Sequence, residues 1–130
     1  MQPHLTLWVG DGVFNARVIT PSEYANNSNQ NATYLRQDNA VLRIYDRDGA
    51  WSVDMKDRHE QFDLVWLDGN KKVIHIVKNA SAESAPSTVF RPLVDARYLI
   101  ELQGGTVDEK TIRIDRAAHF EEGNIQGLKR

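Results

Sequence analysis

The sequence has no cysteine among its 130 residues. Disulfide bonds, thiolate nucleophiles, zinc fingers and iron–sulfur clusters all need cysteine sulfur from the chain, so each of these is excluded. Long apolar runs are also missing, because none approaches the ~20 residues that a helix needs to cross a bilayer. The first residues, MQPHLTLW, lack the layout of a signal peptide. The sequence therefore predicts no membrane span.

The chain has no large excess of charge of either sign. Its 16 Lys and Arg residues stand against 18 Asp and Glu residues, which gives a formal net charge of −2. Nucleic-acid binding needs a clustered basic face, so this balance predicts no nucleic-acid partner. With 41% of its residues hydrophobic, the chain is long enough to form one core. We expect a single globular domain over residues 1–120 and a mobile, charged tail over residues 121–130.

The motifs of the common catalytic chemistries are absent too. There is no nucleophile elbow of the GxSxG type, no phosphate-binding P-loop and no dinucleotide-binding GxGxxG. The four histidines, His4, His59, His75 and His119, share no spacing typical of metal ligands. These absences predict no metal and no other cofactor, and they favour a protein that is not an enzyme.

Short apolar patterns cover most of the chain and predict strands. Apolar residues alternate with polar ones, or run together, over 5–9, 13–19, 40–45, 50–55, 62–67, 72–77, 97–102 and 112–115. Turn-forming residues separate several of these segments, at 10–12, 46–49 and 68–70. Since the strands do not alternate with helices, the pattern does not fit a doubly wound parallel sheet.

One helix start is visible near residue 20. Thr20 and Glu23 have the spacing of a capping box, and Pro21 suits the first helical position. The asparagine-rich residues that follow are poor helix formers, so we expect a helix that breaks there and re-forms over residues 32–36. The predicted class is α+β, mostly β: a small barrel-like or strongly curved antiparallel or mixed sheet with this early helix packed on it.

Three tryptophans are candidates either for the core or for a binding surface. Trp8, Trp51 and Trp66 all fall within or beside predicted strands. Exposed indole rings would offer a stacking surface for carbohydrates or bases, but positions in strands favour core packing. We expect all three in the core, with Trp51 the most exposed.

Residues 55–60, with the sequence Met-Lys-Asp-Arg-His-Glu, form the densest polar cluster, between two predicted strands. Lys56 or Arg58 would hold an anion at such a site. Asp57 or Asp63 would then serve as the acid or base. The simpler interpretation is a solvated, charge-balanced loop, and it is favoured because charged runs are usually exposed.

Asp63 differs from the other acidic residues because it lies between Phe62 and Leu64 in an apolar strand. We expect its carboxylate to be buried, and a buried carboxylate needs either a partner or a shifted pKa. Arg36 and Arg97 are the candidate partners. A structural ion pair and a functional site are both open interpretations.

Several sequence blocks occur in the order and spacing of a known family. They are ARVIT at 16–20, ATYLR at 32–36, VDMKDR at 53–58, FDLVWLDG at 62–69, and ARYLIEL at 96–102 followed by Gly105-Thr106. In these blocks the chain resembles a widespread prokaryotic family, domain of unknown function family 192, also called uncharacterised protein family 0127. The resemblance implies a small β-rich domain with one helix packed on it and no established activity. Because members often follow an export signal or a membrane anchor, it also implies an extracytoplasmic location.

The chain departs from the family pattern at four motifs, one of which is the missing Pro before the element that aligns with residues 62–69. In the helix signature Gly-Leu-Met-x-Arg the Gly and Met are missing, while Arg36 is retained. The element Trp-Met-Lys-Asn-Thr reads Asp-Met-Lys-Asp-Arg at 54–58, and the closing Gly-Asp reads Asp115-Arg116. A site that the family shares at these motifs would therefore be remodelled or lost here.

Together these patterns predict a non-enzymatic binding or accessory module that holds a small ligand or a peptide at one end of the sheet. The candidate ligand-binding residues are Arg36, Trp51, Met55, Lys56, Asp57, Asp63 and Arg97. An alternative is a hydrolase-type enzyme that uses Asp63 or Asp57 as its acid or base. Another is an interaction module that adds a partner strand to an exposed sheet edge. The expected partner is a small ligand or a protein.

Overall fold

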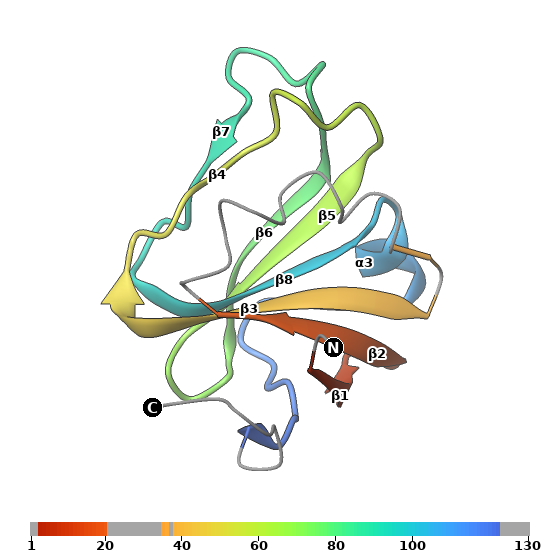
Figure 1. The fold of residues 1–130 in the computed structure, drawn as a ribbon, viewed down its shortest axis with the longest axis vertical. Coiled ribbons are helices and arrows are strands. Elements are labelled where there is room, and N and C mark those ends of the chain that lie inside the picture. The colour runs from red at the N-terminus through yellow and green to blue at the C-terminus, as the bar shows by residue number, and fades with distance from the viewer. Residues whose placement is uncertain (1–2, 21–34, 37, 123–130) are drawn as a thin grey trace.

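The protein is built mostly of β-strands in the computed structural model, which describes residues 3–20, 35–36 and 38–122 (Figure 1). Its strands are β1 (His4–Val9), β2 (Gly12–Ile19), β3 (Asn39–Gly49), β4 (Val53–Asp54), β5 (Phe62–Leu67), β6 (Val73–Ala80), β7 (Val89–Phe90) and β8 (Ala96–Gln103). In this part of the chain the only helix is α3 (Thr106–Glu109), and no helix is long and apolar enough to cross a membrane.

Six of the strands form one mixed sheet in the order β1-β2-β3-β8-β5-β6. β2 and β3 run parallel, and the other neighbouring pairs are antiparallel. β8 therefore lies inside the sheet, between β3 and β5, with both of its edges hydrogen-bonded. The predicted mostly-β fold with a mixed sheet is confirmed. The barrel-like form is not confirmed, because the six strands do not close into a barrel and β1 and β6 end the strand order.

Most of the predicted strands are confirmed, and two local predictions over residues 46–55 are wrong. The hairpin of β5 and β6 and the strand β8 lie close to their predicted bounds. The predicted turn at 46–49 is instead part of β3, and of the predicted strand at 50–55 only Val53–Asp54 forms a strand, β4, which pairs with β7. Pairing with β8 resumes at Gly49 after an irregularity that begins at Ile44. Tertiary pairing thus overrides the local turn preference of residues 46–49.

The predicted helix and tail fall largely outside the described residues. Of the helix that we expect from residue 20 to residue 36, the described residues are Thr20, Leu35 and Arg36. Of the tail predicted over 121–130, they are the first two. Both predictions therefore remain predictions.

The two faces of the sheet carry two separate apolar cores, as the alternation of side chains along each strand requires. The first core includes Leu7, Phe14, Leu42, Val65, Ile100 and Val107. The second core, on the opposite face, includes Val41, Tyr45, Met55, Leu64, Trp66 and Leu99. β4 and β7 pack against the second core through Val53 and Phe90. Strands β3, β5 and β8 supply both cores, so they are apolar on both faces.

The tryptophans only partly match their predicted places. Trp66 is fully buried, and Trp51 is half-buried beside the second core, as expected. Trp8 is 46% exposed, so the predictions that it packs in the core and that Trp51 is the most exposed of the three are both wrong. The reason is the alternation along β1: Leu7 and Val9 face the first core, which leaves Trp8 on the outer side of an edge strand.

After α3, residues 110–120, which we call the C-terminal segment, run between the two outer strands of the sheet. At β6, the amide of Val73 donates to the carbonyl oxygen of Arg116 over 2.9 Å. At β1, Trp8 and His119 exchange two backbone hydrogen bonds of 2.9 and 2.8 Å. The side chains of Ile112, Ala118 and Phe120 are buried in the first core. The segment is therefore held at both outer strands by backbone hydrogen bonds, and its buried side chains anchor it in the first core.

The turn between β1 and β2 is pressed against this segment. The amide of Asp11 donates to the carbonyl oxygen of Lys110 over 2.6 Å. Gly10 has a left-handed φ of +58°, and a Cβ atom there would lie 2.4 Å from that same carbonyl oxygen. Only glycine fits this contact without moving the turn away from the segment.

Gly10→Ala is therefore expected to lower the free energy of unfolding by about 3 kcal/mol, because it combines left-handed backbone strain with a backbone collision. Gly105→Ala is the matched control: Gly105 has a φ of +95°, but a Cβ atom added there would meet no other atom within 4 Å. The control is expected to cost about 1 kcal/mol, from backbone strain alone. Urea denaturation measures both values. Equal losses in the two variants would show that the turn does not press on the segment.

Candidate functional site

The C-terminal segment bends sharply at two non-glycine residues. Thr111 and Asp115 have left-handed φ angles of +55° and +73°. These bends make the predicted strand at 112–115 wrong, since a strand needs extended backbone throughout. A left-handed β-branched residue is rare, and such strained residues cluster at functional sites. Between the bends Ile112 is buried, while Arg113 is exposed.

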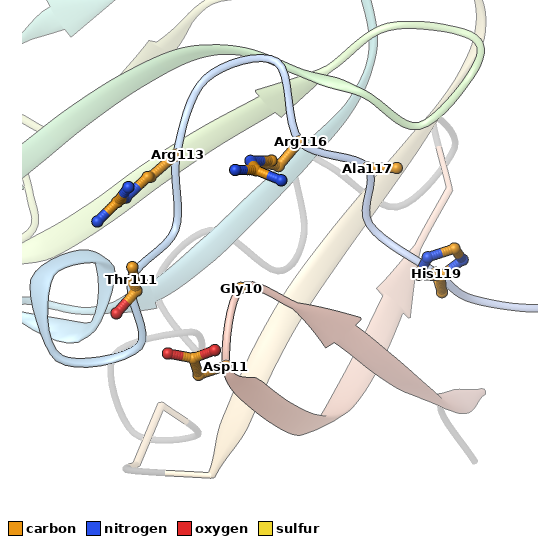
Figure 2. Close-up of a pocket in the computed structure, with 7 residues that line it drawn as sticks. All are labelled: Gly10, Asp11, Thr111, Arg113, Arg116, Ala117 and His119. Carbon is orange, nitrogen blue, oxygen red and sulfur yellow. The ribbon is translucent and has the colours of Figure 1, made fainter.

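An open pocket lies between the β1–β2 turn and the C-terminal segment (Figure 2). It has a volume of about 540 Å³ and is lined by Gly10, Asp11, Thr111, Arg113, Arg116, Ala117 and His119. Figure 2 shows Arg113 and Arg116 extending from the segment toward the same side, with the Asp11 carboxylate across from them on the turn. We call this cavity the arginine pocket.

The arginine pocket carries an excess of positive charge. Arg113 and Arg116 are exposed and form no ion pair with any residue that the structure describes. Among the described residues that line the pocket, Asp11 is the only carboxylate. Arg97, by contrast, pairs with Asp48 over 2.9 Å. Two guanidinium groups therefore stand against one carboxylate in the pocket.

This composition suits an anion. A guanidinium group offers paired N–H donors that fit two oxygens of a carboxylate or a phosphate at once. Arg113 and Arg116 are three residues apart around one bend, and both line the same pocket. In the described residues no cluster of three or more His, Asp or Glu side chains is placed to hold a metal ion.

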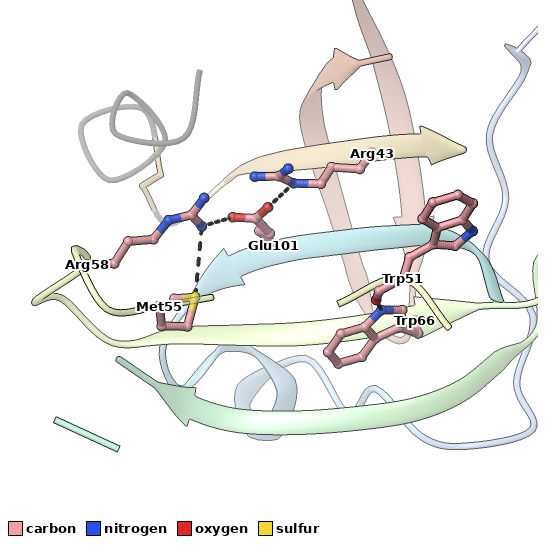
Figure 3. Close-up of polar contacts among 6 residues, drawn as sticks. All are labelled: Arg43, Trp51, Met55, Arg58, Trp66 and Glu101. Atoms are coloured by element: carbon pink, nitrogen blue, oxygen red, sulfur yellow. Dashed lines mark hydrogen bonds and ion pairs between the residues drawn. The ribbon is translucent and has the colours of Figure 1, made fainter. Parts of the chain in front are cut away.

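A second polar cluster lies in the second core, on the other face of the sheet (Figure 3). Glu101 on β8 is fully buried, and Arg43 on β3 and Arg58 after β4 are 6% and 4% exposed. The two arginines each donate to one oxygen of the Glu101 carboxylate. Arg58 also contacts the sulfur of Met55 at 4.0 Å and lies over the ring of Phe62 at 5.6 Å. The cluster ties the 55–60 loop to the centre of the sheet.

The charges of this cluster determine the ionisation of Glu101. Burial by itself raises the pKa of the Glu101 carboxyl. The charges and hydrogen bonds of Arg43 and Arg58 outweigh burial and lower that pKa from 4.5 to about 2. Glu101 is therefore ionised at neutral pH, and its contacts are those of a structural ion-pair network.

The predicted site residues of the 55–60 region separate in the structure. Met55 is fully buried, whereas Lys56 and Asp57 are exposed on a turn closed by the 2.9 Å bond from the amide of Arg58 to the carbonyl oxygen of Met55. Arg36 is exposed, and its Nη1 donates to the carbonyl oxygen of Leu35 over 3.4 Å. Whether these residues bind a ligand stays a prediction.

Asp63 is buried as predicted, but its partners differ from those predicted. Its carboxylate accepts hydrogen bonds from the backbone amides of Asn79, Gly105 and Val107, at 3.0, 3.1 and 2.8 Å. The predicted ion pair with Arg36 or Arg97 is therefore wrong. Because its neighbours on β5 face the second core, Asp63 points to the opposite side from Met55. Its role is to hold the start of α3 against β5 and β6.

Trp51 and Arg97, the other predicted residues, make separate contacts. The ring of Trp51 stacks on Tyr45 with centroids 4.6 Å apart, and the Arg47 guanidinium lies 5.1 Å from the Trp51 ring. Its carbonyl oxygen accepts a 2.9 Å hydrogen bond from Nε1 of Trp66 (Figure 3). The predicted set thus occupies both faces of the sheet and does not meet in one site.

The residues of the arginine pocket could not be found from the sequence because no motif marks them. The alternation over 112–115 makes Arg113 look like a solvated residue of a strand, and Asp11 looks like a turn residue. The spacing of Arg113 and Arg116 is the one available signal. It becomes informative only with the bend at Asp115, since Asp tolerates left-handed backbone but does not require it.

Glu101→Gln tests the buried cluster. Since the pKa of Glu101 is lowered from 4.5 to about 2 on folding, its charge stabilises the fold above pH 4.5. That stabilisation, about 3 kcal/mol, is lost as the pH falls toward 2. We expect Glu101→Gln to lower the free energy of unfolding at pH 7 by about 4 kcal/mol, because two buried arginines lose their counter-charge, and to remove this acid-dependent loss. Urea denaturation at several pH values measures both effects.

The matched control for Glu101→Gln is Lys56→Ala on the exposed turn nearby, which is expected to change stability by less than about 0.5 kcal/mol. A Glu101→Gln variant that keeps the stability and the acid dependence of the unmodified protein would contradict a structural role for the cluster.

Asp63→Ala is expected to lower the free energy of unfolding by about 3 kcal/mol, because three amide donors lose their acceptor at a buried position. The exposed Asp57→Ala serves as its control and should change stability by less than about 0.5 kcal/mol. Thermal or urea denaturation compares the two. Similar midpoints for both variants would show that Asp63 does not hold α3 in place.

Comparisons with known proteins show which solved structures share this fold and which family the chain matches. No curated protein matches the chain. A crystal structure from Sinorhizobium meliloti 1021, of a protein provisionally described as a transcription regulator, is similar with a TM-score of 0.73 and 16% identity, over 92% of this chain and 94% of that one. A protein of unknown function from Novosphingobium aromaticivorans DSM 12444 is similar with a TM-score of 0.75 and 14% identity, over 89% and 83%. At these identities the likeness shows the fold alone.

The family comparison covers most of the chain. The model of the family DUF192, described as "Uncharacterized ACR", matches residues 23–120. This range contains nearly all of the blocks that carry the resemblance in the sequence, together with β3 to β8 and the whole C-terminal segment. The protein therefore belongs to the DUF192 family.

Proposed function

We propose that the protein is a non-enzymatic binding module that holds a small anionic ligand in the arginine pocket. The ligand class is an anion with two or more terminal oxygens, such as a carboxylate or a phosphate. The observation that carries the proposal is the pair Arg113 and Arg116, which line a cavity of about 540 Å³ and have no ion-pair partner among the described residues.

The surrounding structure supports a pocket that exists before the ligand arrives. The C-terminal segment is hydrogen-bonded to β6 at Val73 and to β1 at Trp8, and Ile112 and Phe120 anchor it in the first core. Both arginines therefore start from a fixed backbone. Binding to a preorganised site loses less conformational entropy, so an open pocket with two exposed arginines gains affinity from its scaffold.

Asp11 sets the charge balance of the pocket. Its carboxylate lines the cavity across from Arg113 and Arg116, and like charge opposes the approach of an anion. Neutralising Asp11 should therefore strengthen anion binding, whereas removing an arginine should weaken it. These opposite signs separate a specific pocket from general attraction to the surface.

Two observations favour binding over the hydrolase alternative. Asp63 is fully buried, and backbone amides already occupy both of its carboxylate oxygens. Asp57 is exposed on a turn and does not line the arginine pocket. Neither carboxyl group meets a bound anion in the arginine pocket, where an acid or base would have to act.

The test is a titration of the protein with inorganic phosphate at low ionic strength, followed by NMR of the backbone amides. We expect shifts confined to residues 10–11 and 111–119. Arg116→Ala should weaken the affinity about three- to fivefold, and Asp11→Asn should strengthen it about twofold, since single charge contacts at exposed sites contribute about 1 kcal/mol or less.

The matched control is Arg91→Ala, which removes the same charge from an exposed loop residue outside the pocket. It should leave phosphate affinity within twofold of the unmodified protein. If Arg91→Ala weakens binding as much as Arg116→Ala, or if no shifts localise to the pocket, the proposed function is wrong.

A further inference from the structure

A second hollow adjoins the arginine pocket on the other side of residues 111–113. It has a volume of about 490 Å³. Its aliphatic lining consists of Ile76 on β6, Val107 on α3, and Ile112 and Ile114 on the C-terminal segment. We call it the aliphatic pocket. Thr111 and Arg113 line both hollows, so the two cavities meet along the same short stretch of chain.

The aliphatic pocket leaves apolar surface in contact with water. Ile114 is 46% exposed, and Ile76 is half-buried, although both are large aliphatic residues. Isolated exposed apolar residues are ordinary on a protein surface, but here they line one hollow beside a charged site. Covering this surface with a ligand chain would release water from it, which is favourable in proportion to the area covered.

The charged residues of the aliphatic pocket indicate where the polar end of a ligand would go. Lys78 pairs with Asp108 over 2.7 Å, so these two charges balance each other. Arg113 is the remaining charged residue in the lining and has no such partner in the described part of the chain. The free positive charge therefore lies on the side of the aliphatic pocket that faces the arginine pocket.

We infer that the ligand is an amphiphilic anion, with a carboxylate or phosphate end held by Arg113 and Arg116 and an aliphatic chain lying in the aliphatic pocket. This inference rests on the proposed function, because the anionic end must bind the arginines for the chain to be positioned. It adds the class of the ligand. The aliphatic stem of Arg113 lies between the two hollows and offers the chain an apolar path from one to the other.

Chain length is the variable that tests this inference. An anion without a chain gains only the arginine contacts, whereas each methylene placed in the aliphatic pocket adds a hydrophobic contribution. We expect octanoate to bind at least tenfold more tightly than acetate, and octyl phosphate at least tenfold more tightly than inorganic phosphate, in NMR titrations of the full chain. Comparing octanoate with octyl phosphate shows whether the arginine pocket prefers a carboxylate or a phosphate end. 1-Octanol, which has the chain but no charge, should bind at least tenfold more weakly than octanoate.

The place of binding is tested with a variant and with the unmodified protein. Ile114→Ser should reduce the ratio of octanoate to acetate affinity to threefold or less. Leu93→Ser, at a residue that is 84% exposed and outside both hollows, is the matched control and should keep the tenfold ratio. Independently of any variant, octanoate should shift the amide of Ile76, which lies outside the residues that an anion alone is expected to shift, and acetate should not.

The outcomes separate this inference from the proposed function. If acetate or phosphate binds but affinity does not rise with chain length, the amphiphilic ligand is wrong and the anion pocket stands. If 1-octanol binds as tightly as octanoate, the arginines do not hold the anionic end and the inference is also wrong. If none of the four anions binds, both proposals fail.

Discussion

The backbone hydrogen bonds between the C-terminal segment and the two outer strands are the constraint on which the functional site depends. Through Trp8 on β1 and Val73 on β6, they join strands that lie at opposite ends of the sheet order. The segment can cross only because Ile112 and Phe120 fill the first core beneath it. With the segment fixed in this way, Arg113 and Arg116 face the β1–β2 turn, and two cavities form beside residues 111–113. Without it, the same arginines would be ordinary solvated side chains.

Two pairs of arginines in this protein differ in what neutralises their charge. Arg43 and Arg58 are buried on the opposite face and are held by the ionised carboxylate of Glu101, whose pKa they lower to about 2. Such a network is costly to disrupt, because removing one member leaves the others as uncompensated buried charges. Arg113 and Arg116 are exposed and line a cavity. Burial with a fixed partner suits a structural role, and exposure beside a cavity suits recognition of a ligand that supplies the partner.

The sequence predicts the fold better than it predicts the site, and the reason is physical. Strand alternation is repeated over many residues, so β5, β6 and β8 are recognisable, and the apolar flanks of Asp63 correctly indicate its burial. The partner of Asp63 is not recognisable, because backbone amides at Asn79, Gly105 and Val107 carry no sequence signature. The arginine pocket is missed for a similar reason: it depends on left-handed backbone at Thr111, a β-branched residue that rarely adopts it, and at Asp115, a residue type that tolerates it without requiring it. The partners of Asp63 and the arginine pocket both depend on contacts between segments that are distant in the sequence.

Amide hydrogen exchange tests most directly whether the C-terminal segment is held at both outer strands. The amides of Trp8, Val73, Ala118 and His119 each donate a hydrogen bond between the segment and the chain near β1 or β6. If the segment is fixed, these amides should exchange within about tenfold of the rates of interior β8 amides, as hydrogen bonds of one cooperative unit do. Exchange of Ala118 and His119 at the rates of an unstructured peptide, with β8 still protected, would contradict the account, because no preformed pocket would then exist.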